Sequence, residues 1–356
     1  MARRSPEVAD LLDQFVTVRV IQAYGLDLSL FQFDYNLTWA VFFLNADRTV
    51  YGRYGTRSEL DGQRDVTLDG FRRAAEAALG LHKHYPANKA ALAKKTGPAP
   101  EWKTPEAIPH AQWKQVKADG TRGNCIHCHM IDTGELQAKR AEGKPITDRD
   151  FWPYPKPDVL GLRLDPRERA TVEAVEPGTP AERAEFKPGD KLLSLEGQPL
   201  VSVADVQWVL HNAPDAGKLA AEVDRGGQKR SLALELPAGW RKGQDIAWRN
   251  YLWPVRFQVV GFKSGPAADA DRKRAGAPAL VVQELPPSFV RNRNDGPQKA
   301  GLRKGDRITA ADGKPELVRD EGRLLGYVMQ AKKPGDELTL TVLRDGKERA
   351  VTFAVK

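Results

Sequence analysis

Residues 184–192 read AEFKPGDKL, and residues 300–308 repeat this stretch as AGLRKGDRI. The correspondence continues from EGQP at 196–199 to DGKP at 312–315, and from RGG at 225–227 to RDG at 344–346. A spacing near 116 residues is too long for a solenoid repeat and indicates two copies of one domain. This duplication decides the fold of the C-terminal half.

Each copy is typical of short strands arranged around a Gly-Asp turn, followed by a helix and a terminal hairpin. Gly189-Asp190 and Gly305-Asp306 form tight turns before apolar strands, and the RGG and RDG sequences are expected hairpin turns. Apolar residues at helical spacing predict the helix, with Val203, Val206, Val209 and Leu210 in the first copy and Leu324, Leu325 and Val328 in the second.

The pattern A-x-x-A/G-Φ-K-x-G-D, in which Φ is apolar, resembles that of bacterial PDZ domains, over residues 156–238 and 255–356 with a linker at 239–254. The resemblance implies capture of protein C-termini or extended peptides by strand addition, beside a loop that holds the terminal carboxylate. We place this loop at Leu160, Gly161 and Leu162, and at Val260, Gly261 and Phe262. A long insertion at 264–277 follows the second loop. The alternative is that the grooves are filled and the domains are spacers.

PDZ domains of this type often accompany serine proteases. The chain contains no G-x-S-x-G and no G-N-S-G-G sequence, so proteolysis by a serine nucleophile is not predicted.

The first 96 residues predict a helix near residues 6–12, a strand at 15–21, a hairpin at 39–54 and a helix at 68–82. The hairpin sequence WAVFFLNAD followed by VYGRYG resembles the centre of thioredoxin-like domains, which are α/β in fold. The first strand and the redox motif that the resemblance implies are missing here. We interpret Met1 as an internal methionine, with a selenocysteine codon upstream read as a stop, or else the domain as a degenerate scaffold.

Residues 97–155 form a connector rich in proline and tryptophan, and it contains the sequence Cys125-Ile126-His127-Cys128-His129. C-x-x-C-H is the attachment signature of c-type haem, with Cys125 and Cys128 as thioether anchors and His129 as the ligand of the haem iron. His110 is a candidate for the other axial position. A zinc site and a redox-active dithiol are the alternatives.

Composition fits an α+β multidomain protein with 29% charged and 41% hydrophobic residues. The net charge of +8 is spread thinly, so nucleic-acid binding is not predicted. No run of about 18 apolar residues is present, which excludes a transmembrane segment of the usual kind from this sequence. Covalent haem implies a periplasmic or other extracytoplasmic location, and we take the export signal to have been removed from this chain or to lie upstream.

The order of these parts resembles a bacterial family of thioredoxin-like, tandem-PDZ (seleno)proteins. Our first hypothesis is therefore an electron-transfer protein with one haem c that docks a redox partner protein through its PDZ domains. The alternatives are a non-enzymatic peptide-binding scaffold and a thiol or selenol oxidoreductase with its active site upstream of Met1. The sequence does not decide whether the chain is an enzyme.

Overall fold

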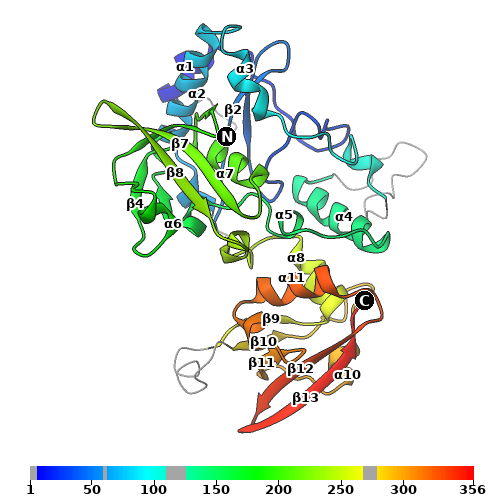
Figure 1. The fold of residues 1–356 in the computed structure, drawn as a ribbon. Coiled ribbons are helices and arrows are strands. Elements are labelled where there is room, and N and C mark those ends of the chain that lie inside the picture. Colours follow the sequence, from blue (N-terminus) through cyan, green and yellow to red (C-terminus); the bar gives the residue numbers. More distant parts are fainter. Residues whose placement is uncertain (1–5, 59–61, 110–125, 268–278) are drawn as a thin grey trace, which may run out of the picture. The chain divides into compact units, whose positions relative to one another are not determined.

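The computed structural model describes residues 6–58, 62–109, 126–267 and 279–356. They form two compact units (Figure 1). The first contains Met1–Ile131 and Trp152–Gln244, and the second contains Asp132–Phe151 and Asp245–Lys356. Each unit therefore holds one copy of the repeated sequence together with segments from earlier in the chain.

The N-terminal part of the first unit is a hairpin packed on a helix. Strands β1 (Val41–Leu44) and β2 (Val50–Tyr54) pair antiparallel, and helix α2 (Leu68–Lys83) buries Ala74, Ala75 and Ala78 against them. Thr67 caps α2 by accepting a hydrogen bond from the Gly70 amide. The hairpin and this helix confirm the sequence prediction for residues 41–83.

Smaller helical elements surround this hairpin. They are η1 (Pro6–Val8), α1 (Ala9–Leu12), η2 (Gly62–Asp65), α3 (Lys89–Leu92), η3 (Ala93–Lys95) and η4 (Pro105–Ala107). The predicted strand at 15–21 is wrong, because the segment is irregular and leaves Val16, Val18 and Ile21 largely exposed. Its β-branched residues favour a strand locally, but no neighbouring strand among the described residues pairs with it.

The first copy of the repeat completes the first unit. Its strands form a pair, β3 (Leu162–Leu164) with β4 (Val172–Val175), and a four-stranded sheet in the order β6-β5-β7-β8. The sheet comprises β5 (Lys191–Leu195), β6 (Gln198–Pro199), β7 (Gly217–Arg225) and β8 (Gln228–Leu236). Helix α7 (Val203–Asn212) lies between strands β6 and β7 in the chain, and the helical elements η5 (Pro157–Leu160), α6 (Pro180–Arg183) and η6 (Trp240–Gly243) lie in the connections.

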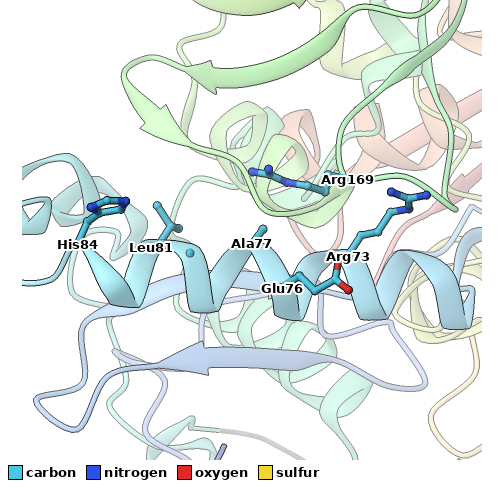
Figure 2. Close-up of a pocket in the computed structure, with 7 residues that line it drawn as sticks. Arg73, Glu76, Ala77, Leu81, His84 and Arg169 are labelled. Atoms are coloured by element: carbon cyan, nitrogen blue, oxygen red, sulfur yellow. The ribbon is translucent and has the colours of Figure 1, made fainter. Parts of the chain in front are cut away.

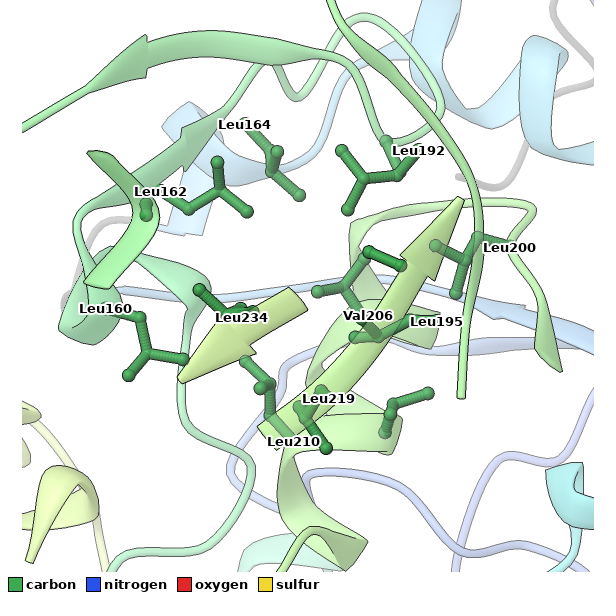
Figure 3. Close-up of a cluster of buried hydrophobic side chains, with 14 of the residues drawn as sticks. Leu160, Leu162, Leu164, Leu192, Leu195, Leu200, Val206, Leu210, Leu219 and Leu234 are labelled. Atoms are coloured by element: carbon green, nitrogen blue, oxygen red, sulfur yellow. The ribbon is translucent and has the colours of Figure 1, made fainter. Parts of the chain in front are cut away.

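A single hydrophobic core holds this copy together (Figure 3). Leucines from the strands meet Val206 and Leu210 of α7, and the labelled side chains point toward one another. Eight consecutive residues of α7, from Val203 to Leu210, are buried. A helix buried on all sides has a second face that packs on something other than its own sheet.

The second copy forms one five-stranded antiparallel sheet in the order β13-β12-β11-β10-β9. The strands are β9 (Lys263–Pro266), β10 (Leu280–Glu284), β11 (Arg307–Ala311), β12 (Glu337–Arg344) and β13 (Lys347–Ala354). Its helical elements are α8 (Leu252–Pro254), the π-helical η7 (Val255–Val260), α10 (Gly296–Lys299), η8 (Pro315–Val318) and α11 (Glu321–Ala331). Because β9 pairs with β10, the second loop stays in its domain despite the insertion.

Part of the predicted connector is helical. Helix α4 spans Cys128–Ala141, so it begins within the C-x-x-C-H motif, earlier than the short helix expected from residue 135. Helix α5 (Asp148–Phe151) follows. Within the second unit, the Arg140 guanidinium donates to the carbonyls of Lys332 and Lys356, and the Gln330 amide donates to Asp148.

The repeated Gly-Asp turn builds the same buried ion pair in each copy. Asp190 accepts two hydrogen bonds from Arg225 at 2.6 and 2.7 Å, and Asp306 accepts two from Arg344 at 2.6 Å. Both aspartates are almost fully buried. Bidentate pairing of this kind satisfies the carboxylate at its turn and ties the turn to the terminal hairpin.

Candidate peptide-binding site

In the first copy, the predicted loop lies between η5 and β3. Gly161 has a left-handed backbone (φ 79°), which turns the chain from the short helix into the strand. Leu160 and Leu162 on either side are buried in the hydrophobic core. The Gly161 amide donates to the Asp158 carbonyl at 2.9 Å, so this loop amide is already bonded within the loop.

Strand β3 presents one edge to β4 and leaves the other without a strand neighbour among the described residues. The Gly161 carbonyl accepts from the Glu176 amide, and the Asp165 amide donates to the Thr171 carbonyl, both on the β4 side. Because peptide groups alternate along an antiparallel strand, those of Leu162 and Leu164 face the other edge. An extended peptide that adds a strand there meets outward-facing donors and acceptors.

Helix α7 begins with an apolar residue. Val203 is its first residue, after the Ser202 cap, and both Val203 and Leu164 of β3 belong to the hydrophobic cluster of this copy. The first position of the helix therefore has an apolar side chain, as does the position in β3.

The second copy has the same backbone turn with different hydrogen bonding. Gly261 is again left-handed (φ 87°), and it follows the π-helical turn η7. The amides of Gly261 and Phe262 both donate to the Arg256 carbonyl, at 2.7 and 2.9 Å, and Val260 is buried. The two loop amides that would meet a terminal carboxylate therefore have a partner inside the domain.

A buried ion pair crosses the second groove, and the sequence alone did not single out its residues. Glu321, the first residue of α11, accepts from Arg256 Nε at 3.0 Å and from the Ser264 amide of β9 at 2.8 Å. At the equivalent positions the first copy has Val203 and Leu164. An alignment of the two repeats could have identified this pair, because two apolar residues in the first copy correspond to two polar residues in the second.

The outer face of α7 is covered by the N-terminal hairpin. Asp205 accepts from the Arg53 amide of β2 at 3.1 Å and pairs with Lys95 at 2.8 Å, and both side chains of that pair are 1% exposed. The Arg53 guanidinium lies 3.9 Å from the ring centroid of Trp208 and donates to the Gln32 and Lys95 carbonyls. The hairpin and the first copy thus share one set of buried polar contacts.

The C-x-x-C-H motif lies partly outside the described residues, since Cys125 and His110 fall in the undescribed range. Ile126 is buried, and His127 and His129 stack with ring centroids 5.7 Å apart. Burial and then the neighbouring His127 lower the pKa of His129. Among the described residues, no group of three or more His, Cys, Asp or Glu side chains is arranged to hold a metal ion.

A shallow hollow of about 470 Å³ lies along α2 (Figure 2). Five of its seven lining residues belong to this helix, and the other two are His84, which caps the helix, and Arg169. Arg73 pairs with Glu168 at 3.2 Å, and Arg169 donates to the Leu200 carbonyl at 2.6 Å. These contacts hold the hollow's two arginines to the protein itself, and none of the predicted site residues lines it.

Comparisons with known proteins identify the repeated domain. The family model described as PDZ domain matches residues 158–236 and 277–355. A Neisseria meningitidis protein named "Putative zinc metalloprotease" is 31% identical over 180 residues, which cover 50% of this chain and 34% of that protein. A Pseudomonas savastanoi protein named "Probable periplasmic serine endoprotease DegP-like" is 25% identical over 199 residues, covering 53% and 38%. The chain thus spans about a third of the length of these curated relatives.

A solved structure described as the HtrA-type protease AlgW with tripeptide aligns with a TM-score of 0.25 and 12% identity. The alignment covers 52% of this chain and 59% of that chain. A score this low carries no argument about the fold.

The comparisons overturn the first functional hypothesis. The relatives are named as proteases, and the matched family is the PDZ domain rather than a haem or electron-transfer family. The prediction of a haem c electron-transfer protein is therefore wrong, and the peptide-binding alternative fits better. The thioredoxin-like relationship of the N-terminal segment stays a prediction. In the part of the chain that the structure describes, no helix is long and apolar enough to cross a membrane.

The family match at residues 158–236 and 277–355 shows that the protein carries two PDZ domains in tandem, as the repeated sequence predicted.

Proposed function

We propose that the protein is a peptide-binding scaffold whose first PDZ domain takes up an extended peptide along β3. The outward-facing peptide groups of Leu162 and Leu164 support this proposal, together with the apolar first residue of α7. A peptide added at a strand edge gains main-chain hydrogen bonds from such groups and specificity from the adjoining side chains. Because the Gly161 amide is bonded to Asp158, the strand edge contributes more to binding than the loop does.

Hydrogen exchange tests this mode of binding directly. The probe is a pool of random ten-residue peptides, from which binders to the full chain are selected and then added in excess. Strand addition at β3 slows exchange of the Leu162 and Leu164 amides at least about tenfold, because they become hydrogen-bonded. The Arg163 amide, which faces β4, serves as the internal control and keeps its rate.

Two results would count against the proposal. A selected peptide that binds without slowing either leucine amide binds elsewhere. A pool that yields no binder leaves the two domains as spacers. The affinity of each selected peptide is also compared with that of the same peptide carrying an amidated C-terminus. Weaker binding of the amidated form indicates capture of a chain terminus, and equal binding indicates capture of an internal segment.

We infer a scaffolding role for the N-terminal segment as well. The order of the hairpin and helix at residues 41–83 supports a thioredoxin-like relationship, and the Lys95–Asp205 pair supports a fixed attachment to the first PDZ domain. The name of the periplasmic DegP-like relative supports an extracytoplasmic location. Fractionation of native cells, with periplasmic and cytoplasmic marker proteins as controls, tests that location.

A further inference from the structure

The second PDZ groove contains a carboxylate where a peptide would bind. Glu321 is 5% exposed, although it opens helix α11 just after the Asp320 cap. Its Oε1 accepts from the Ser264 amide at 2.8 Å, and its Oε2 accepts from both Nε and Nη2 of Arg256. A carboxylate this deeply buried is stable only when its oxygens are satisfied in this way.

The Ser264 amide is the group that an added strand would use. Ser264 is opposite Val282 in the pairing of β9 with β10, but its amide donates to Glu321 instead of to β10. It therefore points toward the edge of β9 that has no strand neighbour among the described residues, since β9 is the last strand in the order of its sheet. A peptide cannot hydrogen-bond to this amide until Glu321 leaves it.

Arg256 closes the groove at two places. Its guanidinium holds Glu321 and also donates to the Ala247 carbonyl at 2.7 Å. Its own carbonyl accepts the amides of Gly261 and Phe262 in the loop. One residue thus engages both the strand edge, through Glu321, and the loop.

We propose that Arg256 and Glu321 form an autoinhibitory latch that keeps the second PDZ groove closed to peptides. The inference rests on the proposed peptide-binding function and assigns it unequally to the two domains. In the first domain, Leu164 and Val203 take the positions of Ser264 and Glu321, and neither side chain carries a group that can bond to the strand edge. The first groove is open to peptides, whereas the second binds them only when its latch is released.

The double substitution R256M/E321A tests the latch without leaving a buried charge unpaired. The Ser264 amide loses its acceptor, so its exchange becomes at least about tenfold faster than in the wild type. The Val282 amide, which donates to Asp306 inside the sheet, keeps its slow exchange if the domain remains folded. E348Q, at an exposed position of β13, is the matched control and changes neither rate.

The milder substitution E321Q guards against misfolding of the double variant. It keeps an oxygen for the Ser264 amide but weakens the hold of Arg256, so Ser264 exchange increases by a smaller factor, about threefold. Unchanged Ser264 exchange in both variants overturns the latch.

Peptide binding tests its inhibitory role. The same random ten-residue peptide pool is applied to the full wild-type chain and to R256M/E321A, and NMR shifts of residues 263–266 report binding at β9. We expect these shifts in the variant at peptide concentrations at least tenfold lower than in the wild type. Equal shifts in both proteins overturn the inhibition. Faster Ser264 exchange with no peptide bound at β3 or β9 overturns the proposed peptide-binding function, and with it the inhibition.

Discussion

The two PDZ domains share a scaffold and differ at the edge where a peptide would bind. Both bury an aspartate of the Gly-Asp turn against an arginine of the terminal hairpin. In the first domain, Leu164 and Val203 are apolar members of the hydrophobic core, whereas the equivalent residues of the second domain, Ser264 and Glu321, are joined by a hydrogen bond. The residues that hold the turn are therefore the same in both copies, whereas the residues at the edge of the groove differ.

A second difference concerns the buried carboxylate on the helix of each domain, α7 in the first and α11 in the second. Asp205 of α7 is paired with Lys95 and with the Arg53 amide from the N-terminal segment. The corresponding helix α11 keeps its buried carboxylate, Glu321, within its own domain. The same element therefore anchors a neighbouring segment in one domain and closes the groove in the other.

The largest expected effect comes from breaking the contact that only the first domain has. Replacing Lys95 by Met leaves Asp205 buried without its cation, which costs about 3–5 kcal/mol of unfolding free energy in the first unit. Chemical denaturation, monitored by the hydrogen exchange of the α7 amides, measures this loss.

The second domain offers a matched control for that substitution. Lys332 pairs with Asp312 at 2.7 Å, but both side chains retain solvent contact, at 17% and 21% exposure. Replacing Lys332 by Met is expected to cost about 1 kcal/mol or less. Equal losses at the two sites would mean that the Lys95 pair does not anchor the hairpin to the first domain.

Alanine at either loop glycine is expected to destabilise its domain. Both glycines are left-handed, which costs a residue with a side chain about 1–2 kcal/mol. A Cβ on Gly261 would also meet the Asn294 carbonyl oxygen at 2.4 Å, and one on Gly161 would meet the Cβ of Thr179 at 2.4 Å. Neither of these atoms can move away by a side-chain rotation.

Gly161→Ala and Gly261→Ala should therefore each destabilise their domain by more than the backbone cost alone. Thermal unfolding of each variant measures the loss, with Gly346→Ala as a control, because that glycine is left-handed in a turn with open space around it. A loss at either loop glycine no larger than that for Gly346→Ala would show that backbone conformation alone sets the cost.

The smallest expected effect is a shared dependence on pH. Burial raises the pKa of Asp190 and of Asp306. Hydrogen bonds from Arg225 and Arg344, together with backbone hydrogen bonds and the charges of these arginines, outweigh burial and hold both pKa values below the ordinary value. As the pH falls below about 4, the unfolded chain takes up these protons first, so the stability contributed by the pairs is lost.

The variant D190N should flatten this acid-induced loss for the first domain alone, and D306N for the second alone. Measuring the unfolding free energy of each variant between about pH 3 and 6 checks this, because the unfolded-state pKa of Asp lies within that range. Identical slopes for the wild type and both variants would mean that other carboxylates control acid unfolding.

Local sequence patterns carried much of the fold prediction. The repeat around Gly189-Asp190 and Gly305-Asp306 predicted two copies of one domain, because tight turns and alternating apolar residues are encoded over short distances. The same holds for helix α2 and the hairpin before it. The strand predicted at 15–21 was wrong, since β-branched residues form a strand only where a partner strand is available.

The C-x-x-C-H motif shows the limit of inferring function from a short signature. Five residues led to a predicted electron-transfer function, whereas the matched family is the PDZ domain and the relatives are named as proteases. A short motif defines a chemistry only when the surrounding domain provides the site for it.

The sequence by itself determined that this protein contains a duplicated PDZ domain, because turns, periodicity and the Gly-Asp motif are local properties. Only the tertiary structure decided that the two grooves are unequal. Arg256, Ser264 and Glu321 are separated by up to 65 residues, and the partner of a buried charge depends on which distant segments the fold brings together. For the same reason, the pairing of Lys95 with Asp205 across 110 residues became visible only in three dimensions.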